Sequence, residues 1–489
     1  MRRQSRPRCR FSIDYPRRLA YQNPAHYPGR DGRRQKGLDR SMHGVHSIRC
    51  TLLVKLCKGP ARALAAVFVL IGLACAAAAA EPLIREGEEL ALERCIEIAV
   101  GNQPSIRQLL HASQASEAVL GQARSSYYPQ VDLRSGLTRY NAVTQHGDPY
   151  PPQSTYGYRY FDNSLNLQQK IYDFGKREGN VDVARLNVDA ARSNIDDEIA
   201  SVVNNVKSAY YGVLRSRKAR DVAVEVRDQY RRQLAQAKIF FEAGKKPKYD
   251  VTAAEVLVGN AEISLVRAEN DLDIAWVALS NAMGYEGAAR YSIREAPPAE
   301  PYAIAEEEAL EQAYGHRSDL QSLLAQKEAA RRTVEVARKD YFPSLDASAG
   351  YGAAGSETPL SQGWNVGMSL SWNLFKGYAT EQEIARTAAL LRAVEARISV
   401  LKLQIRQEVK RALLELKRAR ETIGNAGLQV RQATENLDLA NLRYSSGLGA
   451  PLEVSDAVVA YSSAKLTQIS ASYDLILAQA SIERAMGRR

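Results

Sequence analysis

The sequence is poor in cysteine, and the placement of its few cysteines excludes several kinds of site. Four of the five cysteines lie in the first 80 of the 489 residues, so Cys95 is alone in the remainder. A single thiol forms neither an internal disulfide nor a thiolate metal cluster. We therefore expect residues 81–489 to be stabilised by packing, by assembly or by both.

Histidines and catalytic motifs are equally scarce. Residues 81–489 contain three histidines, His111, His146 and His316, and their spacing matches no metal site. The sequence has no phosphate-binding loop, no GxSxG nucleophile motif and no HExxH zinc motif. We expect a protein that is not an enzyme and holds no metal or cofactor, so a partner has to supply the energy for any transport.

Acidic residues are scarce only near the amino terminus. Residues 1–80 hold 16 of the 66 Lys and Arg but three of the 55 Asp and Glu. Residues 81–489 therefore hold 50 basic and 52 acidic residues, a net charge of −2 against +11 for the whole chain. Because nucleic-acid binding depends on a basic surface, we expect no nucleic-acid partner.

The first 80 residues form a leader in two parts. Residues 1–41 are rich in arginine and turn-forming residues, and fit either a disordered tail or a reading frame that extends upstream of a true start near Met42. The run "ALAAVFVLIGLACAAAAAEP" (63–82) follows three basic residues and ends in small residues, as in a secretory signal cleaved near Ala80. An uncleaved membrane anchor is the alternative. A lipid-modified Cys75 is a third interpretation, although "IGLAC" matches the usual lipobox poorly.

Short motifs recur along residues 81–489 and indicate an internal repeat. The matching pairs are "NAMG" (281–284) with "RAMG" (484–487), "FEAG" (241–244) with "YSSG" (444–447), and "SSYYPQVDLRSG" (125–136) with "KDYFPSLDASAG" (339–350). The first two pairs have the same separation, 203 residues. We interpret 81–284 and 308–489 as two copies of one structural unit, joined by a linker at 285–307.

Each copy contains a long stretch without a helix breaker, at 176–241 and 379–444. At 1.5 Å per residue, a helix of about 65 residues is about 100 Å long, far beyond an ordinary globular helix. This length favours coiled-coil-like packing, and a turn and a return helix of about 35 residues follow each stretch. Shorter helices are expected at 88–125 and 306–340.

Four shorter runs have the pattern of β-strands, at 130–140, 161–172, 344–352 and 363–375. In the last, "GWNVGMSLSWNLF", large apolar residues alternate strictly with Gly, Ser and Asn. A strand in a soluble sheet usually has about 5–6 residues, whereas about 9–11 cross a bilayer. The alternation favours a membrane strand over the edge of a soluble sandwich, with a lipid-facing side formed by Trp364, Val366, Met368, Leu370, Trp372 and Leu374.

Four strands are too few to close a barrel, since about eight is the smallest usual number. An open sheet edge in lipid leaves backbone groups unpaired, at a cost of several kcal/mol each. We therefore expect several chains to share one barrel, with eight strands from two chains or twelve from three. The expected fold class is mainly α with a membrane β-barrel, from which long helical hairpins extend into an aqueous compartment.

The chain resembles the TolC family of outer-membrane efflux and secretion channels. The resemblance rests on the order of three features: the repeated motifs, "YYP" or "YFP" before the first strand of each copy, and the glycine turns after Phe241 and Tyr444. The resemblance covers roughly residues 85–488. It implies a homotrimer with a shared 12-stranded outer-membrane β-barrel and a trimeric periplasmic α-barrel whose equator lies near 285–307. It also implies a passive exit duct for a tripartite efflux pump or a type I secretion system, with a periplasmic adaptor, an inner-membrane transporter and outer-membrane lipid as partners.

The resemblance further implies a periplasmic gate at the turns of the two hairpins, formed by Asp250, Tyr444, Glu453 and Asp456. Three-fold symmetry would arrange each carboxylate in a ring that attracts cations. Alternatively, Asp250 and Glu453 are ordinary first-turn carboxylates favoured by the helix dipole.

The same resemblance implies that the turns contact the adaptor, through Gly244, Lys245, Lys246, Gly447, Leu448 and Gly449. A basic residue near the second turn closes the gate in the family prototype, whereas this chain has Gly449 at that position. The lock is therefore rearranged or weaker here. The alternative for the lysines is a solvated tip.

A periplasmic coiled-coil adaptor or scaffold is the alternative function. It explains the helices and the signal, but not four alternating strands with aromatic residues near their ends, at Trp364, Trp372, Tyr140 and Tyr351. Aromatic residues at strand ends suit a membrane interface, so extraction from membranes distinguishes the two functions. The cargo does not follow from the sequence, because a duct selects weakly and the pump chooses.

Overall fold

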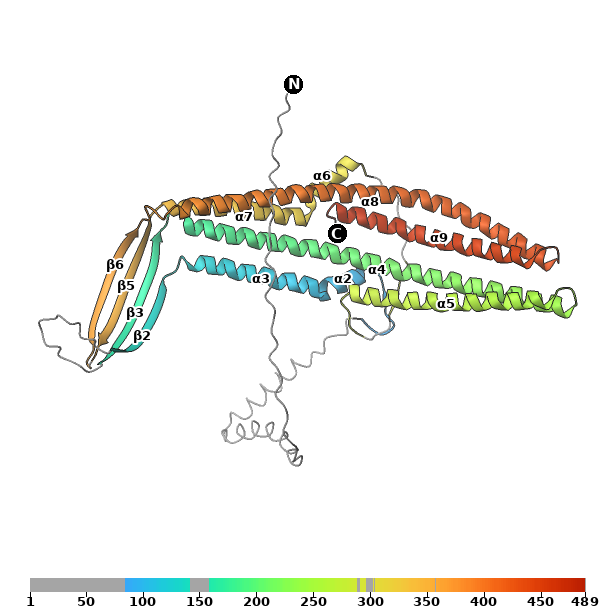
Figure 1. The fold of residues 1–489 in the computed structure, drawn as a ribbon, viewed down its shortest axis with the longest axis horizontal. Helices are drawn as coiled ribbons and strands as arrows, with labels where there is room; N and C mark the ends of the chain where they lie inside the picture. Colours follow the sequence, from blue (N-terminus) through green and yellow to red (C-terminus); the bar gives the residue numbers. More distant parts are fainter. Residues whose placement is uncertain are drawn as a thin grey trace, which may run out of the picture. The chain divides into compact units, whose positions relative to one another are not determined.

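The computed structural model describes residues 84–140, 158–287, 291–295, 302, 304–356 and 358–488 (Figure 1). All of them belong to one unit, Pro82–Arg489. The predicted leader with its cleavage point near Ala80 and Cys75, the loop 141–157, and parts of the predicted linker 285–307 lie outside the described residues. The side chains of Tyr140 and His146 are likewise not described.

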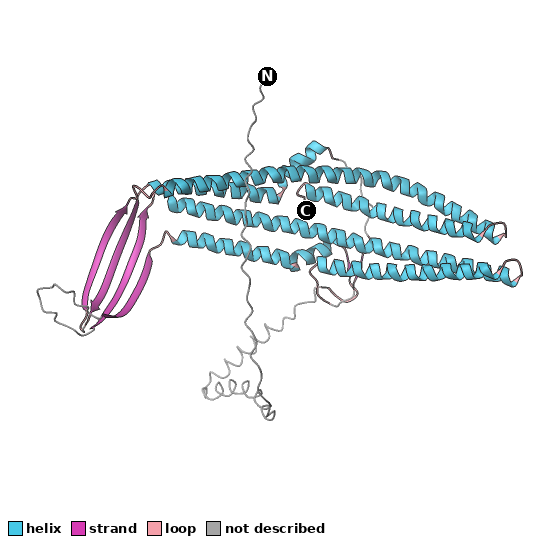
Figure 2. Cartoon of the chain, viewed as in Figure 1, coloured by secondary structure: helices cyan, strands magenta, loops and turns pink. Residues whose placement is uncertain are grey.

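Helices dominate the described residues, as predicted (Figure 2). The helices are α2 (Leu92–Asn102), α3 (Pro104–Ser125), α4 (Lys176–Glu242), α5 (Lys248–Ala282), α6 (Glu306–His316), α7 (Ser318–Arg338), the 3-10 turn η1 (Lys339–Tyr341), α8 (Ala379–Ser445) and α9 (Pro451–Ala485). The two long helices, α4 and α8, begin at the predicted residues and end one residue later than predicted. Their existence and length are therefore confirmed.

The prediction of one short helix before each sheet segment was wrong, because each is divided in two. Between α2 and α3, the backbone of Gln103 is extended (ψ 122°), because the ring of Pro104 disfavours the helical conformation of the residue before it. Between α6 and α7, no proline follows Arg317, yet its backbone is also extended (ψ 120°). There the buried guanidinium of Arg317 bonds Asp319 Oδ2 at 2.7 Å. The backbone of Arg317 also packs tightly against Gly487, since a Cβ added to this glycine would lie 2.8 Å from Arg317 N.

The four long strands form one antiparallel sheet in the order β2, β3, β5, β6. Their bounds are β2 (Gln130–Tyr140), β3 (Tyr158–Tyr172), β5 (Ser344–Gly355) and β6 (Ser361–Ser371). Directly paired residues project to the same face. One row across the sheet is Leu133, Leu165, Tyr351 and Trp364, and the next row, on the opposite face, is Asp132, Asn166, Gly350 and Asn365. One face is therefore apolar and the other polar.

The predicted strand 363–375 was too long at its carboxyl end. β6 stops at Ser371, whose partner is Ser344, the first residue of β5. The residue before Ser344 is Pro343, which has no N–H to donate to a ladder. Trp372 and Leu374 consequently lie beyond the strand, and Trp372 Nε1 donates to the carbonyl of Tyr341 at 3.0 Å.

The helices α4 and α5 form a first hairpin, and α8 and α9 form a second. The hairpins are joined by contacts between α4 and α9, while α3 and α7 pack along α4 nearer the sheet. Within Pro82–Arg489 the sheet lies at one end of the helices and the two hairpin turns lie at the other (Figure 1). Among the helices described, none combines the length and the apolar character required to cross a membrane.

A further hydrophobic cluster lies where α2 and the predicted linker meet α4. Two short strands pair in parallel there, β1 (Glu89–Leu90) and β4 (Ser292–Ile293). The buried Tyr210 of α4 donates its hydroxyl to the carbonyl of Arg294 at 2.6 Å and so attaches β4 to the helix. Cys95 is buried in the same cluster, and this burial raises the pKa of its thiol to about 12. The lone thiol is therefore a protonated packing group.

Candidate functional site

The ends of the two hairpins hold most of the predicted site residues. Both turns depend on a glycine in the left-handed region, Gly244 with φ 71° and Gly447 with φ 77°. At these positions the next N–H groups turn back to the helix end, with Lys245 N 2.9 Å from the carbonyl of Phe240 and Leu448 N 2.9 Å from that of Arg443. The predicted tip residues lie at these two turns and are exposed, except for the half-buried Lys246 and the buried Gly449.

Gly449 has no room for a side chain. A Cβ there would lie 2.9 Å from the backbone nitrogen of Tyr444 and 3.1 Å from the carbonyl carbon of Arg443. The basic group of this turn is Arg443 itself, whose Nε donates to Glu453 Oε2 at 3.2 Å. Arg443 is not among the residues predicted from the sequence, although a cation and a carboxylate that flank a tight turn are a visible signal for such a pair. One predicted gate carboxylate is thus already paired within its own chain.

The four predicted gate residues do not form one cluster. Glu453 and Asp456 are exposed on α9, whereas Tyr444 is buried and Asp250 half-buried. Only Asp250 and Tyr444 line the same cavity, which has a volume of about 560 Å³. Burial, and after it the negative charge of Asp250, raises the pKa of the Tyr444 hydroxyl. This hydroxyl is therefore neutral at physiological pH.

The cavity between the hairpin ends is mostly apolar. We call it the tip cavity; its lining residues are Gln233, Tyr249, Asp250, Thr252, Ala253, Ala254, Val256, Leu257, Tyr444, Ala450, Pro451, Leu452 and Ser455. The ring of Tyr444 packs edge-on against Phe240, with 5.7 Å between centroids. Among the described residues, Tyr444 Oη and Gln233 Oε1 are buried without a hydrogen-bond partner.

Three polar side chains of α4, spaced by four residues, face the second hairpin. They are Glu225, Gln229 and Gln233, and together with their partners we call them the inter-hairpin ladder. Glu225 Oε1 accepts a hydrogen bond from Tyr461 Oη at 2.6 Å, and Glu225 Oε2 accepts one from Lys465 Nζ at 3.2 Å. Both donors belong to α9, so this carboxylate links the two hairpins.

The other two rungs extend the ladder toward the turns. Gln229 Nε2 donates to Asn441 Oδ1 of α8 at 2.8 Å. Gln233 Nε2 donates to the carbonyl of Pro451, the first residue of α9, at 3.1 Å. The ladder was not predicted from the sequence; its signal was the recurrence of polar residues at every fourth position beside the apolar face that α4 buries.

The ladder changes the proton affinity of its donors. Burial, and then the hydrogen bond to Glu225, raises the pKa of Tyr461. The hydrogen bond with Tyr461 raises the pKa of Lys465, burial opposes this rise, and the bond to Glu225 adds to it. Both groups therefore stay protonated through the physiological range and keep donating.

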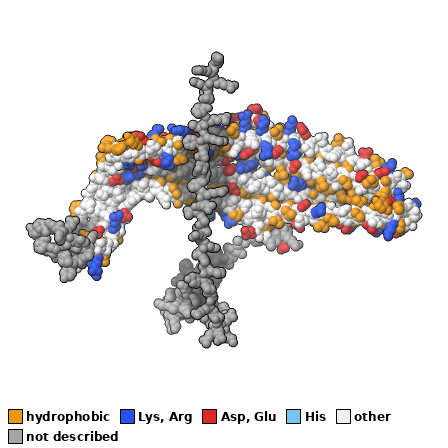
Figure 3. Space-filling model, viewed as in Figure 1, with side chains coloured by type: hydrophobic (Ala, Val, Ile, Leu, Met, Phe, Trp, Pro, Cys, Tyr) orange, Lys and Arg blue, Asp and Glu red, His pale blue; other side chains and the backbone are white. Residues whose placement is uncertain are grey.

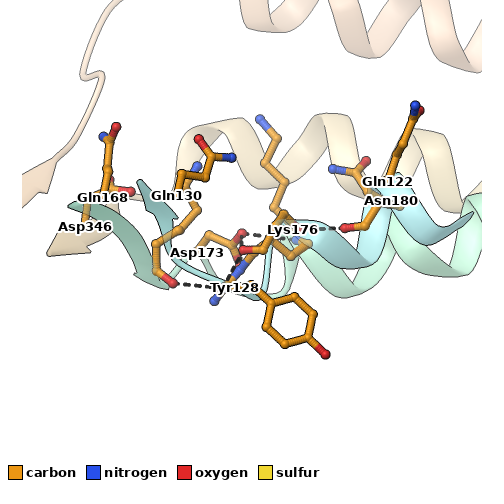
Figure 4. Close-up of a pocket in the computed structure, with 12 residues that line it drawn as sticks. Gln122, Tyr128, Gln130, Gln168, Asp173, Lys176, Asn180 and Asp346 are labelled. Atoms are coloured by element: carbon orange, nitrogen blue, oxygen red, sulfur yellow. Dashed lines mark hydrogen bonds and ion pairs between the residues drawn. The ribbon is translucent and has the colours of Figure 1, made fainter. Parts of the chain in front are cut away.

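A second cavity, of about 540 Å³, lies where the polar face of the sheet meets the helices (Figure 4). Gln130, Gln168 and Asp346 reach it from the strands, and Asp173 and Lys176 from the turn into α4. Its cations are largely satisfied: Lys176 pairs with Asp340, and Arg177 bonds Asp173 and the carbonyls of Lys170 and Ile171. This region fixes the sheet to the helices.

The six residues predicted to face lipid divide into two groups. Trp364, Val366, Met368 and Leu370 share the apolar face of β6 and are 67–78% exposed. Trp372 and Leu374 lie after the strand, as described above, and are also exposed. In the part of the chain that the structure describes, no group of three or more His, Cys, Asp or Glu is arranged to hold a metal ion.

Comparison with known proteins gives consistent matches over most of the chain. The family model for outer membrane efflux proteins matches residues 95–285 and 309–488. Protein CyaE of Bordetella pertussis is 26% identical over 375 residues, which are 75% of this chain and 77% of that protein. Outer membrane protein TolC of Escherichia coli is 22% identical over 403 residues, 79% of this chain and 80% of that protein. Among solved structures, the outer-membrane channel OprN superposes with a TM-score of 0.72 at 18% identity, covering 81% of this chain and 90% of its own. The CmeC outer membrane channel of Campylobacter jejuni gives 0.69 at 18% identity, covering 81% and 85%.

Proposed function

Because the chain belongs to the outer membrane efflux protein family, we propose that it is a passive exit duct in the outer membrane. It serves a tripartite efflux pump or a type I secretion system, and moves small molecules or polypeptides outward without catalysing a reaction. The resemblance to the TolC family, inferred from the sequence, is confirmed by the family match and by both relatives. The observation that carries the proposal is the sheet with one apolar and one polar face, because lipid requires the first and an aqueous pore the second.

A homotrimer completes this sheet. Within the described strands, β2 and β6 are the edges and each pairs on one side only. Unpaired backbone groups are costly in lipid, so three copies that join edge to edge would close a barrel of twelve strands. Large apolar side chains along α5, each more than half exposed, support the same assembly because neighbouring copies would cover them: Tyr249, Val256, Ile263, Val266, Ile274 and Val277. Figure 3 shows hydrophobic side chains toward the end of the hairpins at which the chain turns.

The chain is proposed to contain two copies of one unit, 81–284 and 308–489, joined by the linker 285–307. Every bound of α8 and α9 lies 203 residues after the corresponding bound of α4 and α5. Each long helix also follows two residues with positive φ, Phe174 and Gly175 in one case and Gly377 and Tyr378 in the other. Residues 1–80 would act as the leader and export signal, cleaved near Ala80, and the helices would then lie in the periplasm.

The hairpin ends are proposed to form the periplasmic gate and the adaptor contact. In a trimer, Asp250, Glu453 and Asp456 would each occur three times around the mouth, and Tyr444 would pack behind Asp250. The turns, with Gly244, Lys245, Lys246, Gly447, Leu448 and Gly449, would contact a periplasmic adaptor that connects to an inner-membrane transporter. The exposure of both turns supports the adaptor contact. The inter-hairpin ladder and the Arg443–Glu453 pair would take the place of a basic residue at position 449.

The test is single-channel conductance of detergent-extracted residues 81–489 in a planar bilayer. The parent protein should give small, cation-favouring currents, and the Asp250→Ala/Asp456→Ala variant should give larger ones. Asp271→Ala/Asp273→Ala, which removes two exposed carboxylates of α5 far from the turns, is the matched control and should behave like the parent.

Two outcomes would contradict parts of this proposal. Equal conductance in parent and gate variant would keep the channel but remove these carboxylates from the gate. A protein that stays soluble without detergent and conducts nothing would mean that the sheet does not enter a membrane. In that case a periplasmic coiled-coil adaptor or scaffold would be the better function.

A further inference from the structure

The helices of the two hairpins form a layer with two outer edges. α5 packs on α4, α4 on α9, and α9 on α8, so α5 and α8 are the outer helices (Figure 1). Both edges carry large apolar side chains that the chain leaves exposed. Val266 and Ile274 of α5 are 64% and 58% exposed, and Leu414 and Leu428 of α8 are 59% and 47% exposed. Exposed apolar rows of this kind mark protein–protein contacts.

The internal repeat supplies a template for the contact that covers these edges. Because α8 and α9 begin and end 203 residues after α4 and α5, α8 is the counterpart of α4, and α5 is the counterpart of α9. The contact of α4 with α9 therefore has a counterpart, a contact of α8 with α5. Within one chain these two helices lie at opposite edges of the layer. The counterpart contact thus joins α8 of one copy to α5 of the next.

The face of α8 that this contact needs is uncovered. On α4, Tyr211 and Gln233 are 8% and 5% exposed. The ring of Tyr211 lies 6.3 Å from that of Tyr473 on α9, and Gln233 bonds the first carbonyl of α9. Their counterparts on α8, Leu414 and Asn436, are both exposed. The surface that α9 covers on the first hairpin is therefore left open on the second.

The matching face of α5 is uncovered as well. On α9, Ile469 and Leu477 pack against the hydrophobic cluster that contains Tyr210 of α4. Their counterparts on α5 are Val266 and Ile274, which are more than half exposed. Both halves of the template contact are thus present on each chain, one at each edge of the layer.

We propose that α8 of one copy packs antiparallel on α5 of the next copy, in the register of the α4–α9 contact. In this register Leu428 meets Val258 where Glu225 meets Tyr461 within one chain, and Leu414 meets Asn270 where Tyr211 meets Tyr473. The inference rests on the proposed trimer. It adds which helices of neighbouring copies meet and at which residues.

The contact between copies differs in chemistry from its template. The carboxylate of Glu225 and the hydroxyl of Tyr461 are replaced by Leu428 and Val258, so an apolar contact takes the place of a charge-assisted hydrogen bond. One hydrogen bond returns in the same position. Gln233 Nε2 donates to the carbonyl of the first residue of α9 at 3.1 Å. Its counterpart, the amide of Asn436, donates to the carbonyl of the first residue of α5 in the next copy.

Cross-linking of engineered cysteine pairs tests the register. In residues 81–489 the one native cysteine, Cys95, is buried and has a pKa of about 12, so it does not react. Leu428→Cys/Val258→Cys and Leu414→Cys/Asn270→Cys are the matched pairs. After treatment of the detergent-extracted protein with a short bis-maleimide, denaturing gels should show covalent dimers and trimers for both.

The same four positions provide the control. The swapped pairs are Leu428→Cys/Asn270→Cys and Leu414→Cys/Val258→Cys. Residues 258 and 270 are 12 positions apart on α5, so each swapped pair is displaced by about 18 Å along the helix axis. The swapped pairs should therefore stay unlinked, although they contain the same cysteines.

A second measurement compares two charge substitutions by dissociation of the assembly on dilution. Leu428→Glu places a carboxylate against an apolar face and should raise the concentration of half-dissociation by at least about tenfold. Val459→Glu makes a similar change on α9, at an apolar residue that is 59% exposed but lies on an inner helix of the layer. It should leave the dissociation unchanged.

Swapped pairs that link as well as the matched pairs, or equal dissociation of Leu428→Glu and Val459→Glu, would overturn the proposal. The mass of the particle before cross-linking, from light scattering, separates this failure from failure of the proposed function. A trimer whose matched pairs do not link contradicts only the α8–α5 contact. A protein that is monomeric contradicts the proposed trimer itself, and this contact with it.

Discussion

Glu225 joins the two hairpins, and its removal should favour their separation. The carboxylate lies on α4 and accepts hydrogen bonds from Tyr461 at 2.6 Å and from Lys465 at 3.2 Å, both on α9. The ammonium of Lys465 also lies 5.1 Å from the centre of the Tyr461 ring. Glu225→Ala removes one acceptor and thereby releases two donors of the second hairpin, while α4 keeps a good helix-forming residue.

The magnitude follows from the exposure of the partners. A hydrogen bond to a charged group stabilises by about 1.5–3 kcal/mol. The ion pair adds less, about 0.2–1 kcal/mol, because the side chains of Lys465 and Glu225 are 34% and 45% exposed. We take about 2 kcal/mol per chain, near the lower end of this sum, because Tyr461 replaces the lost hydrogen bond with one to water when the hairpins separate. This corresponds to roughly a thirtyfold change in the ratio of separated to joined hairpins.

Single-channel recording is the assay, because a mouth that opens by hairpin separation should stay open longer in Glu225→Ala. Glu262→Ala is the matched control. Its carboxylate pairs with Arg231 at 2.8 Å, but that pair lies within the first hairpin, between α4 and α5. Equal open times in the parent, Glu225→Ala and the control would refute the reasoning, provided that all three proteins assemble and insert alike.

The same link has a defined pH dependence. The pKa of Tyr461 in the folded chain is raised above its ordinary 10.0, first by burial and then by Glu225. A raised pKa means that the stabilisation is complete below the ordinary value and is lost as the pH rises through the higher, folded one. Open times of the parent should therefore increase above about pH 10, whereas Glu225→Ala should already be open longer at neutral pH and change less.

Two further predictions concern the second turn and the sheet. Gly449→Ala should lower the free energy of unfolding by about 1–3 kcal/mol, because the new Cβ meets the backbone at 2.9 Å. Gly259→Ala on α5, with open space around it, should instead stabilise by up to about 1 kcal/mol; thermal unfolding that ranks the two variants the other way would contradict the tight turn. Met368→Arg should cost about 2–4 kcal/mol in a bilayer, whereas Asn365→Arg, on the opposite face of β6, should cost little. Denaturant unfolding from lipid vesicles compares them, and equal losses would mean that the faces are assigned wrongly.

Much of the architecture follows from local patterns. The unbroken stretches 176–241 and 379–444 predicted α4 and α8 to within one residue, because a helix continues until a breaker stops it. Alternation along 363–371 correctly predicted two unlike faces for β6. The predicted carboxyl end of this strand was wrong, because a neighbouring strand determines it. β6 ends at Ser371, whose partner Ser344 is the first residue of β5 and follows Pro343.

The candidate site was less predictable than the fold. The turns were recognisable from Gly244 and Gly447, since positive φ favours glycine and both end a helix. Asp250 and Tyr444 were selected through a family resemblance, and the structure brings them to one cavity while leaving Glu453 and Asp456 outside it. Nothing in the residue order indicated that Gly449 is packed against the backbone of Arg443 and Tyr444.

The sequence by itself determined which segments are helices and strands, which sheet face is apolar, and where the hairpins turn. These properties depend on neighbours within a few residues, through backbone preference and the period of each element. Only the tertiary structure decided that Glu225 meets Tyr461, 236 residues away, and that Asp250 and Tyr444 line one cavity. Such contacts depend on the rotation and axial offset of one helix against another, which the packing of the whole unit determines.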